Sequence, residues 1–251
     1  MKITDRTILV TGANRGLGQA LVEEALRRGA KRVYAGASQP FAHPNGRVTP
    51  LIVDVTNTAQ IQAAAEEVDS LDILINNAGL SLYENFSDRA MLERHLAINL
   101  LGAYDVTQAV LPLLTRSRGA IVNVLSLASL APSPFNPAYS VSKAAAFSMS
   151  QVLRALLARQ GVSVHAVLPG PIDTDMTRDL DIPKASPESA AWAIFDGVEK
   201  GEEEIFPDPM SAAMAEGWRT SASKALERQM AAYVEATPVK SPANVSSSMR
   251  S

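Results

Sequence analysis

The stretch TILVTGANRGLGQALVEEALRRG, residues 7–29, decides the fold. It begins with a short apolar run of the kind that forms a buried strand, and it ends with apolar residues at helical spacing. Between them, the glycines at 12, 16 and 18 allow a tight turn and a close backbone approach to a ligand. The N–H groups at the start of the helix would face that turn and favour an anion such as a pyrophosphate. A plain strand-to-helix connection is the alternative, because a glycine-rich turn alone is a weak signal.

The rest of the chain repeats this alternation of strand and helix. Apolar runs rich in β-branched residues predict further strands at 32–36, 50–54, 72–76, 120–124, 163–168 and 203–206. Helical spacing predicts helices at 18–29, 57–68 and 186–201 and one helix within 208–235. This order favours the α/β class, with a doubly wound parallel sheet of about seven strands and helices on both faces. We predict one domain over residues 1–236 and a disordered, Ser- and Pro-rich tail at 237–251.

Composition limits the class of partner. A chain of 251 residues with 47% hydrophobic content can bury one sizeable core, and a formal net charge of −3 gives no basic surface for nucleic acid. There is no cysteine, and His43, His95 and His165 are scattered, so we expect no metal site and treat these histidines as structural or surface residues. We find neither a signal-peptide pattern nor an apolar run that approaches a membrane span, so we expect a cytoplasmic protein with a small-molecule partner.

Four polar or glycine-containing segments each follow a predicted strand. TGANRGLG (11–18) follows the first strand, NNAG (76–79) the fourth, SLAS (126–129) the fifth and PGPIDT (169–174) the sixth. Taken singly, each has an ordinary explanation as a turn, a helix cap or a loop. The carboxyl ends of parallel strands meet at one edge of the sheet, however, and this edge is where such sheets bind ligands. The coincidence predicts one site there.

The stretch PAYSVSKAAAF, residues 137–147, places a phenol beside an ammonium. Tyr139 and Lys143 are four residues apart, so on a helix they share a face. A phenol with a pKa of ~10 must lose about three units to exchange protons near neutrality, at about 1.4 kcal/mol per unit. One cation ~4 Å away supplies roughly the required 4 kcal/mol at an effective dielectric constant near 20. If Asn136 caps the helix, Tyr139 lies in its first turn, where the helix dipole also favours a phenolate. An amphipathic surface pair is the alternative for an isolated motif of this kind.

With these motifs in this order, the chain resembles the short-chain dehydrogenase/reductase superfamily over roughly residues 5–206. The resemblance implies a single-domain Rossmann fold that moves a hydride between a nicotinamide cofactor and an alcohol or carbonyl. It implies that Tyr139 is the general acid/base, that Lys143 lowers its pKa and holds the ribose, and that Ser126 orients the substrate oxygen. It also implies that Asn99 supports a proton relay through water to the lysine. An amide in an apolar helix can instead simply bond a nearby carbonyl, so Asn99 has a structural alternative.

The same resemblance implies the residues that bind the cofactor. Asp54 and Val55 would contact adenine, and Ile172 and Thr174 would bind the nicotinamide carboxamide. Asp54 has an alternative as a helix-capping residue. The full predicted set is Gly12, Asn14, Arg15, Gly16, Leu17, Gly18, Ser38, Asp54, Val55, Asn77, Ala78, Gly79, Tyr139, Lys143, Pro169, Ile172 and Thr174.

The end of the second predicted strand bears on which dinucleotide is used. An NAD enzyme normally places a carboxylate there to bind the ribose 2′-hydroxyl, but Ala37 and Ser38 occupy that place. Arg15 resembles the basic residue that NADP-preferring members of the family place against the 2′-phosphate. Alternatively, it simply points into solvent. We expect NADP(H), with NAD as the other possibility.

Apolar residues near the predicted site favour a small, largely apolar ketone, aldehyde or secondary alcohol as substrate, as for a carbonyl reductase. The candidate lining is Leu80, Tyr83, Leu127, Leu130, Phe135, Pro171 and Met176, although each of these residues could equally belong to the core. We expect either a homodimer or a homotetramer. The alternative function is a non-catalytic NADP-binding regulator on the same fold, which would have no need for Ser126, Tyr139 and Lys143 together.

Overall fold

The computed structural model describes residues 1–236, so the predicted disordered tail lies outside the described residues. The described residues divide into two compact units, the first Met1–Ala215 and the second beginning at Glu216. The prediction that residues 1–236 form one domain stays a prediction.

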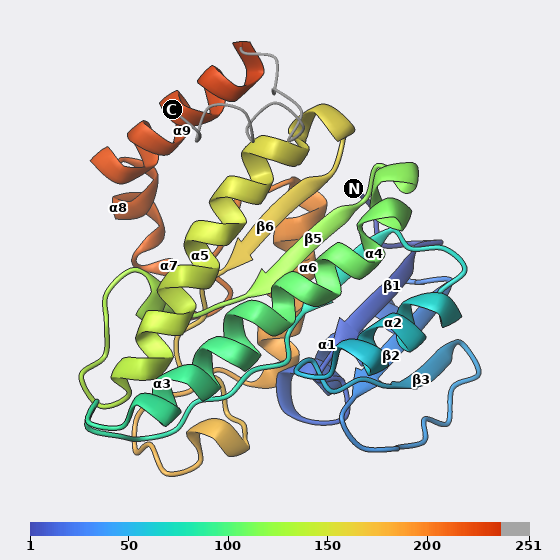
Figure 1. Cartoon of the computed structure of the whole chain (residues 1–251), viewed down its shortest axis with the longest axis horizontal. Coiled ribbons are helices and arrows are strands. Elements are labelled where there is room, and N and C mark those ends of the chain that lie inside the picture. The colour runs from blue at the N-terminus through green and yellow to red at the C-terminus, as the bar shows by residue number, and fades with distance from the viewer. Residues whose placement is uncertain (237–251) are drawn as a thin grey trace, which may run out of the picture. The chain divides into compact units, whose positions relative to one another are not determined.

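The first unit is built on one parallel sheet with the strand order β3-β2-β1-β4-β5-β6-β7 (Figure 1). This order confirms the predicted α/β class and the doubly wound sheet of seven strands. The strands are β1 (Thr7–Thr11), β2 (Arg32–Ala37), β3 (Val48–Ile52), β4 (Ile73–Asn76), β5 (Ala120–Val124), β6 (Ser163–Val167) and β7 (Glu204–Ile205).

Helices cover both faces of this sheet. Figure 1 shows α2, α4 and α5 on the near face and α1 and α6 behind it. The helices of the first unit are α1 (Gly16–Arg27), α2 (Thr58–Glu67), α3 (Arg89–Leu96), α4 (Ala103–Ser117), α5 (Pro137–Leu157), α6 (Pro187–Lys200) and α7 (Pro209–Ala212). Shorter turns are the π-helical η1 (Ala97–Gly102) and the 3₁₀ helices η2 (Leu127–Ser129), η3 (Ala158–Gln160) and η4 (Asp175–Thr177). After them come α8 (Ala215–Arg219) and, in the second unit, α9 (Ala222–Ala236).

The core has two layers because side chains on a strand alternate between the two faces of the sheet. Ile8 and Val10 of β1 are fully buried on the face covered by α1 and α6, whereas Leu9 packs on the opposite face with Val110 of α4 and Leu153 of α5. The central strands are therefore largely apolar and buried on both faces, as the sequence pattern indicates, whereas Pro50 and Ile52 of the edge strand β3 are exposed.

The strand order reverses between β1 and β4, which pair directly in the middle of the sheet. From β1 the chain runs through α1 to β2 and then to β3, which lie on one side of β1 in the sheet. It then returns through α2 to β4, which lies on the other side of β1. The crevice outside the carboxyl ends of strands at such a reversal is the usual ligand site of this architecture. The segments that follow β1, β4, β5 and β6 meet there.

Some predicted boundaries are wrong. The first helix is Gly16–Arg27 rather than 18–29. The third strand is Val48–Ile52 rather than 50–54, and it tolerates Pro50 because it lies at the edge of the sheet. The single helix expected within 208–235 is three helices, α7, α8 and α9. Asp208 begins the first of them, because its side chain accepts hydrogen bonds from the first backbone amides of α7, which ends after one turn.

Within the described residues, one continuous helical stretch, Arg89–Ser117, is long and apolar enough to cross a membrane by length and composition alone. This stretch is not an uninterrupted apolar run, because Asn99, Asp105 and Gln108 lie within it. Only 28% of its most apolar window is buried, yet Val106, Val110 and Leu114 from this stretch are buried core residues of the layer over the sheet. We therefore treat it as part of the fold.

Candidate active site

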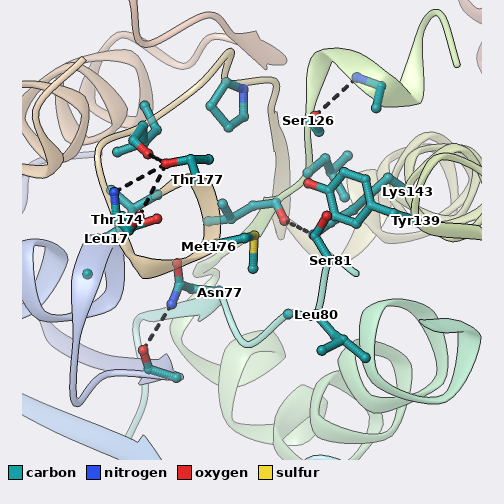
Figure 2. Close-up of a pocket in the computed structure, with 18 of the residues that line it drawn as sticks. Leu17, Asn77, Leu80, Ser81, Ser126, Tyr139, Lys143, Thr174, Met176 and Thr177 are labelled. Carbon is teal, nitrogen blue, oxygen red and sulfur yellow. Dashed lines mark hydrogen bonds between the residues drawn. The ribbon is translucent and has the colours of Figure 1, made fainter. Parts of the chain in front are cut away.

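A cavity of about 1120 Å³ lies along the carboxyl ends of the strands in the first unit. The segments that follow β1, β4, β5 and β6 all contribute to its walls. Of the predicted site residues, those that line it are Gly12, Asn14, Arg15, Gly16, Leu17, Gly18, Ser38, Asp54, Val55, Asn77, Ala78, Gly79, Ser126, Tyr139, Lys143, Pro169, Ile172 and Thr174. Figure 2 shows Ser126, Tyr139 and Lys143 at one side of the cavity and Leu17, Thr174 and Thr177 at the other.

The turn between β1 and α1 requires glycine at three positions. Gly12 and Gly16 have φ angles of +65° and +53°, in the left-handed region that residues with a Cβ rarely adopt. Gly18 has an ordinary φ, but a Cβ there would lie 1.9 Å from the carbonyl oxygen of Gly12. The backbone of the turn is therefore packed against itself, with the Gly18 Cα against the Gly12 carbonyl.

The start of α1 fits an anion. Arg15 occupies the N-cap position, its side chain makes no capping hydrogen bond, and the first turn of the helix contains no acidic residue. The first amides of an α-helix have no partner within the helix, and the helix dipole adds partial positive charge at this end. Together with the bare glycine turn, these amides form a cradle that suits the pyrophosphate of a dinucleotide.

Substituting Gly18 with Ala should destabilise the protein. In an ordinary helix this change gains up to ~1 kcal/mol, but here the methyl group must displace the Gly12 carbonyl, and such overpacking costs about 1–3 kcal/mol. We expect a lower free energy of unfolding in urea and an NADPH dissociation constant raised at least tenfold. Gly46→Ala is the matched control, because nothing lies within 4 Å of a Cβ at Gly46. A Gly18→Ala protein with wild-type stability and wild-type affinity would contradict this packing.

Thr11 and Asn77 hold the glycine turn in place through four hydrogen bonds. The Thr11 hydroxyl accepts hydrogen bonds from the backbone amides of Asn77 and Ala78, at 3.0 and 3.1 Å. The Asn77 side-chain amide donates to the carbonyl oxygens of Thr11 and Gly12, at 3.0 and 3.1 Å. These bonds fix the segment after β1 to the segment after β4. The role of Thr11 was missed in the sequence because a threonine at the end of a strand carries no signal of its own.

Ser126, Tyr139 and Lys143 converge although they come from two different elements. Ser126 is the N-cap of η2, and its oxygen accepts a hydrogen bond from the Ala128 amide at 3.1 Å, which leaves the hydroxyl proton available. Tyr139 is in the first turn of α5 and is hydrogen-bonded to Ser126. Lys143, one turn further along α5, places Nζ 5.7 Å from the centre of the Tyr139 ring and donates to the carbonyl oxygen of Val124 at 2.8 Å.

Burial shifts both titrating groups of this trio away from their charged forms. Burial raises the pKa of the Tyr139 phenol above its usual value, and the hydrogen bond with Ser126 opposes this only in part. Burial lowers the pKa of the Lys143 ammonium to about 8. The sequence argument expected Lys143 to lower the pKa of Tyr139. In the described structure burial dominates instead, and the lowering by Lys143 stays a prediction for the protein with its cofactor bound.

The N-terminus of α5 is capped differently from the prediction. Asn136 occupies the N-cap position, but its side chain makes no capping bond. The Glu84 carboxylate, from the loop after β4, accepts the hydrogen bond of the Ala138 amide at 2.8 Å. The cap therefore comes from a residue 54 positions away in the chain, which no local pattern indicates.

Asn99 is the one predicted catalytic residue that does not line the cavity. It is 3% exposed, and its side chain accepts a hydrogen bond from the Leu80 amide at 2.8 Å and donates to the Leu80 carbonyl at 2.9 Å. It also donates to the Ser142 hydroxyl at 2.9 Å. Its side-chain contacts fit the structural alternative, and the relay role stays a prediction.

The residues expected to bind the adenosine half lie around the far end of the cavity. Arg15 is largely exposed and forms an ion pair with Asp175 at 3.6 Å, so a phosphate there would compete with a carboxylate. Ser38 directly follows β2 and is exposed. The β2 sequence RVYAGA before it contains no carboxylate. The capping alternative for the segment DVTN (54–57) is confirmed at Asn57, the N-cap of α2, whereas Asp54 itself accepts hydrogen bonds from the amide and hydroxyl of Thr56.

The half of the cavity beyond the trio is mostly apolar. Its lining includes six of the predicted apolar residues, Leu80, Tyr83, Leu127, Leu130, Pro171 and Met176. The seventh, Phe135, does not line the cavity and is 74% exposed, because the loop before α5 turns its ring into solvent. Met210 and Met214, which also line it, were missed because the segment after β7 shows no site pattern.

Known proteins are similar to this chain in sequence and in fold. The family model for short chain dehydrogenases matches residues 6–184. The oxidoreductase UcpA of Salmonella typhimurium is 34% identical over 194 residues, which make up 71% of this chain and 74% of the relative. A short chain dehydrogenase from Burkholderia cenocepacia, solved in complex with NADP, has 36% identity and a TM-score of 0.84, covering 91% of this chain and 98% of its own. A short chain dehydrogenase/reductase from Burkholderia phymatum, solved in complex with NAD, shares the fold at 20% identity and a TM-score of 0.78, covering 85% and 92%.

Proposed function

The chain is an oxidoreductase of the short-chain dehydrogenase family, and from this premise we propose that it transfers a hydride between NADP(H) and a small, largely apolar ketone, aldehyde or secondary alcohol. The observation that carries the proposal is the convergence of Ser126, Tyr139 and Lys143 in the same cavity as the glycine turn. A regulator that only bound the dinucleotide would need the turn but not the trio. We therefore favour catalysis over regulation.

In the direction of reduction, Tyr139 donates its phenolic proton to the carbonyl oxygen of the substrate. Its raised pKa keeps the phenol protonated at neutral pH, as a general acid requires. Ser126 donates a hydrogen bond to the same oxygen, since its own oxygen is already oriented by the Ala128 amide. In the direction of oxidation, Tyr139 takes the proton back from the alcohol.

Lys143 serves the cofactor and the phenol together. An ammonium has three protons, and Val124 accepts one of them, which leaves two for the hydroxyls of a ribose. The bound nicotinamide supplies or accepts the hydride. The amides at the start of α1 would hold the pyrophosphate, and the segment Pro169–Thr174 would lie against the nicotinamide. Asn99 acts at a distance from the chemistry, through its bonds to the backbone of Leu80.

We assign NADP(H) rather than NAD(H) because no carboxylate follows β2 and Arg15 lies at the rim of the cavity. A charge-assisted hydrogen bond to a phosphate is worth about 1.5–3 kcal/mol, or roughly ten- to a hundredfold in preference. The relative from Burkholderia cenocepacia was solved with NADP, which supports this choice.

The ratio of kcat/KM for NADPH over NADH tests the choice of dinucleotide. We expect the wild type to favour NADPH at least tenfold and both Arg15→Ala and Ala37→Asp to move the ratio toward NADH. The aspartate should have the larger effect, because it repels the 2′-phosphate and binds the free diol. A wild type that already prefers NADH would refute the assignment.

Oxidation of NADPH, followed by its absorbance against a panel of ketones and aldehydes, separates the enzyme from the regulator. Turnover of at least one apolar carbonyl compound supports the enzyme. Binding of NADPH without turnover of any carbonyl compound, together with no reduction of NADP by secondary alcohols, supports the regulator.

We further propose that the protein acts in the cytoplasm as a homodimer or homotetramer and that residues 1–236 form one domain. Large apolar side chains on the outer faces of α4 and α5, including Tyr104, Val152 and Leu156, are exposed, and a second copy could cover them.

A further inference from the structure

Asp208 is a buried carboxylate that does not line the cavity. It is the N-cap of α7, and Figure 1 shows this helix beside the carboxyl end of β6. Its Oδ1 accepts hydrogen bonds from the backbone amides of Met210 and Ser211, at 3.1 and 3.0 Å. Its Oδ2 accepts from the Ser211 hydroxyl and from the Gly170 amide, each at 2.7 Å. Three of these bonds are local to α7, whereas the bond from Gly170 spans 38 residues of the chain.

The Gly170 amide belongs to a peptide unit that is held at both of its polar ends. At the other end, the Pro169 carbonyl accepts the amide hydrogen of Leu127 at 2.9 Å. A peptide unit is planar, so two bonds on its opposite edges fix its orientation. The Pro169–Gly170 peptide is therefore fixed between Leu127 on one side and Asp208 on the other.

The same segment holds the backbone on both sides of Ser126. Leu125 donates its amide hydrogen to the Val167 carbonyl at 2.8 Å, and Leu127 donates to the Pro169 carbonyl. These two bonds continue the parallel ladder between β5 and β6 beyond the ends of the strands. A shift of the segment after β6 would therefore also move the backbone around Ser126.

The contact between Asp208 and this segment is tightly packed. A Cβ at Gly170 would lie 2.8 Å from Oδ1 of Asp208 and 3.3 Å from the Cβ of Met210. Asp208 is 6% exposed, Ser211 is fully buried, and both Gly170 and Met210 line the cavity. A buried carboxylate that is bonded on both oxygens and lies behind the wall of a cavity fixes that wall, as the supporting residues of a functional site do.

We propose that Asp208 is a positioning residue that holds the Pro169–Gly170 peptide, and with it the wall of the nicotinamide site, in a fixed place relative to Ser126. This inference rests on the proposed function, in which the nicotinamide lies against Pro169–Thr174. Ser126 and Tyr139 orient the substrate oxygen in that function, so a displacement of the wall would misalign the two reactants. A displacement of about 1 Å can cost ~10²-fold in rate.

Asp208→Asn tests this role, because all four partners of Asp208 are hydrogen-bond donors. An asparagine has one acceptor oxygen, and its NH₂ group is itself a donor. One orientation of the new side chain leaves the two α7 amides without an acceptor, whereas the other leaves only the Gly170 amide without one. The second orientation is therefore favoured, and we expect the Pro169–Gly170 peptide to move away from the NH₂ group.

Two ligands measure the effect without turnover. They are NADPH and 2′-phospho-ADP-ribose, which is NADP without its nicotinamide. In Asp208→Asn, we expect the dissociation constant for NADPH to rise at least tenfold and that for 2′-phospho-ADP-ribose to stay within about twofold of the wild type. A smaller folded fraction would raise both constants equally, so it cancels in their ratio. NADH and ADP-ribose form the pair if the wild type prefers NADH.

The rate provides a second measurement. With a ketone or aldehyde that the wild type reduces, kcat of Asp208→Asn should fall about ten- to a hundredfold. Asp88→Asn is the matched control, because Asp88 is also an N-cap aspartate, at the start of α3, and does not line the cavity. Its ratio of dissociation constants and its kcat should equal those of the wild type.

If Asp208→Asn does not fold, Ser211→Ala replaces it, because this change removes only the hydroxyl bond to Oδ2. It should raise the ratio of dissociation constants about two- to threefold. The inference is overturned if the variant that folds keeps the wild-type ratio, or if Asp88→Asn changes the ratio equally. Turnover of a carbonyl compound with either result leaves the proposed function standing. A raised ratio without turnover of any carbonyl compound by the wild type supports the inference and refutes the proposed function. If the wild type binds neither dinucleotide, both fail together.

Discussion

Tyr139→Phe is expected to lower kcat by about a thousandfold while leaving the dissociation constant for NADPH within about twofold of the wild type. The substitution deletes only the hydroxyl that donates the proton, and general acid catalysis of this kind contributes about 10²–10⁴-fold. The ring stays, so its packing and its place beside Lys143 are kept. Single-turnover kinetics and a fluorescence titration with NADPH measure the two quantities.

Tyr104→Phe serves as the matched control, because Tyr104 is 44% exposed on α4 and does not line the cavity. Its rate should match the wild type. If Tyr139→Phe retained a rate within about threefold of the wild type, Tyr139 would not be the acid, since even a weak general acid contributes more than that.

Lys143→Met should damage both rate and cofactor affinity while making the cofactor-free protein more stable. Methionine keeps a long apolar side chain but removes the ammonium, so the two protons left for the ribose are lost. We expect kcat to fall about a hundredfold and the dissociation constant for NADPH to rise at least tenfold. A variant that lost rate alone, with unchanged affinity, would contradict the role at the ribose.

The stability gain follows from the lowered pKa of Lys143. Burial brings it from 10.5 to about 8, which corresponds to about 3 kcal/mol of unfavourable free energy for the charged form. Between these two pH values the unfolded chain binds more protons than the folded protein, so the free energy of unfolding rises with pH there. Below pH 8 the full cost is present. Removing the charge should therefore raise the melting temperature at pH 7 by a few degrees, after allowing for the lost bond to Val124.

The dissociation constant of the wild type for NADPH should depend on pH with the same pKa of Lys143. The ammonium form holds the ribose, and it is lost as the pH rises through about 8, so binding should weaken above that value. Lys143→Met should lack this step. An affinity profile that is flat from pH 7 to 9 in the wild type would contradict the assignment.

The fold and the cofactor end of the cavity could be predicted because their signals are local. The run at 7–29 contains a strand, a glycine turn and a helix in one continuous segment, and the positive φ angles of Gly12 and Gly16 are what the glycines predict. The strand-helix alternation likewise predicts a parallel sheet, and strand order then brings four separate segments to one edge.

What could not be predicted depends on contacts between distant parts of the chain. Glu84 caps α5 across 54 residues, and His95 holds Leu82 through a ring nitrogen, although the sequence offers only an isolated histidine. The expected capping by Asn136 was wrong, because the Glu84 carboxylate accepts the bond of the Ala138 amide, and the Oδ1 of Asn136 has no hydrogen-bond partner among the described residues. A polar side chain has several potential hydrogen-bond partners, and which one it binds depends on the packing of the folded protein.

For Tyr139 and Lys143, too, one property could be predicted from the sequence and another could not. The spacing of Tyr139 and Lys143 predicts that they share a face of α5, and Nζ of the lysine does lie over the tyrosine ring. The spacing does not show how deeply the pair is buried, and burial reverses the direction expected for the pKa of Tyr139. Desolvation depends on everything packed around a group, which a motif does not contain.

Transfer of deuterium from NADPH labelled at C4 of the nicotinamide tests the central claim most directly. The protein is incubated with the labelled dinucleotide and an apolar ketone or aldehyde. The alcohol is then analysed by mass spectrometry, with separate labels on the two faces of the nicotinamide ring. The account predicts deuterium on the carbinol carbon of the product from one of the two labels only, and no labelled product with Tyr139→Phe over the same time. An alcohol product without deuterium from either label, or no alcohol product from any carbonyl compound while the protein binds NADPH, would contradict it.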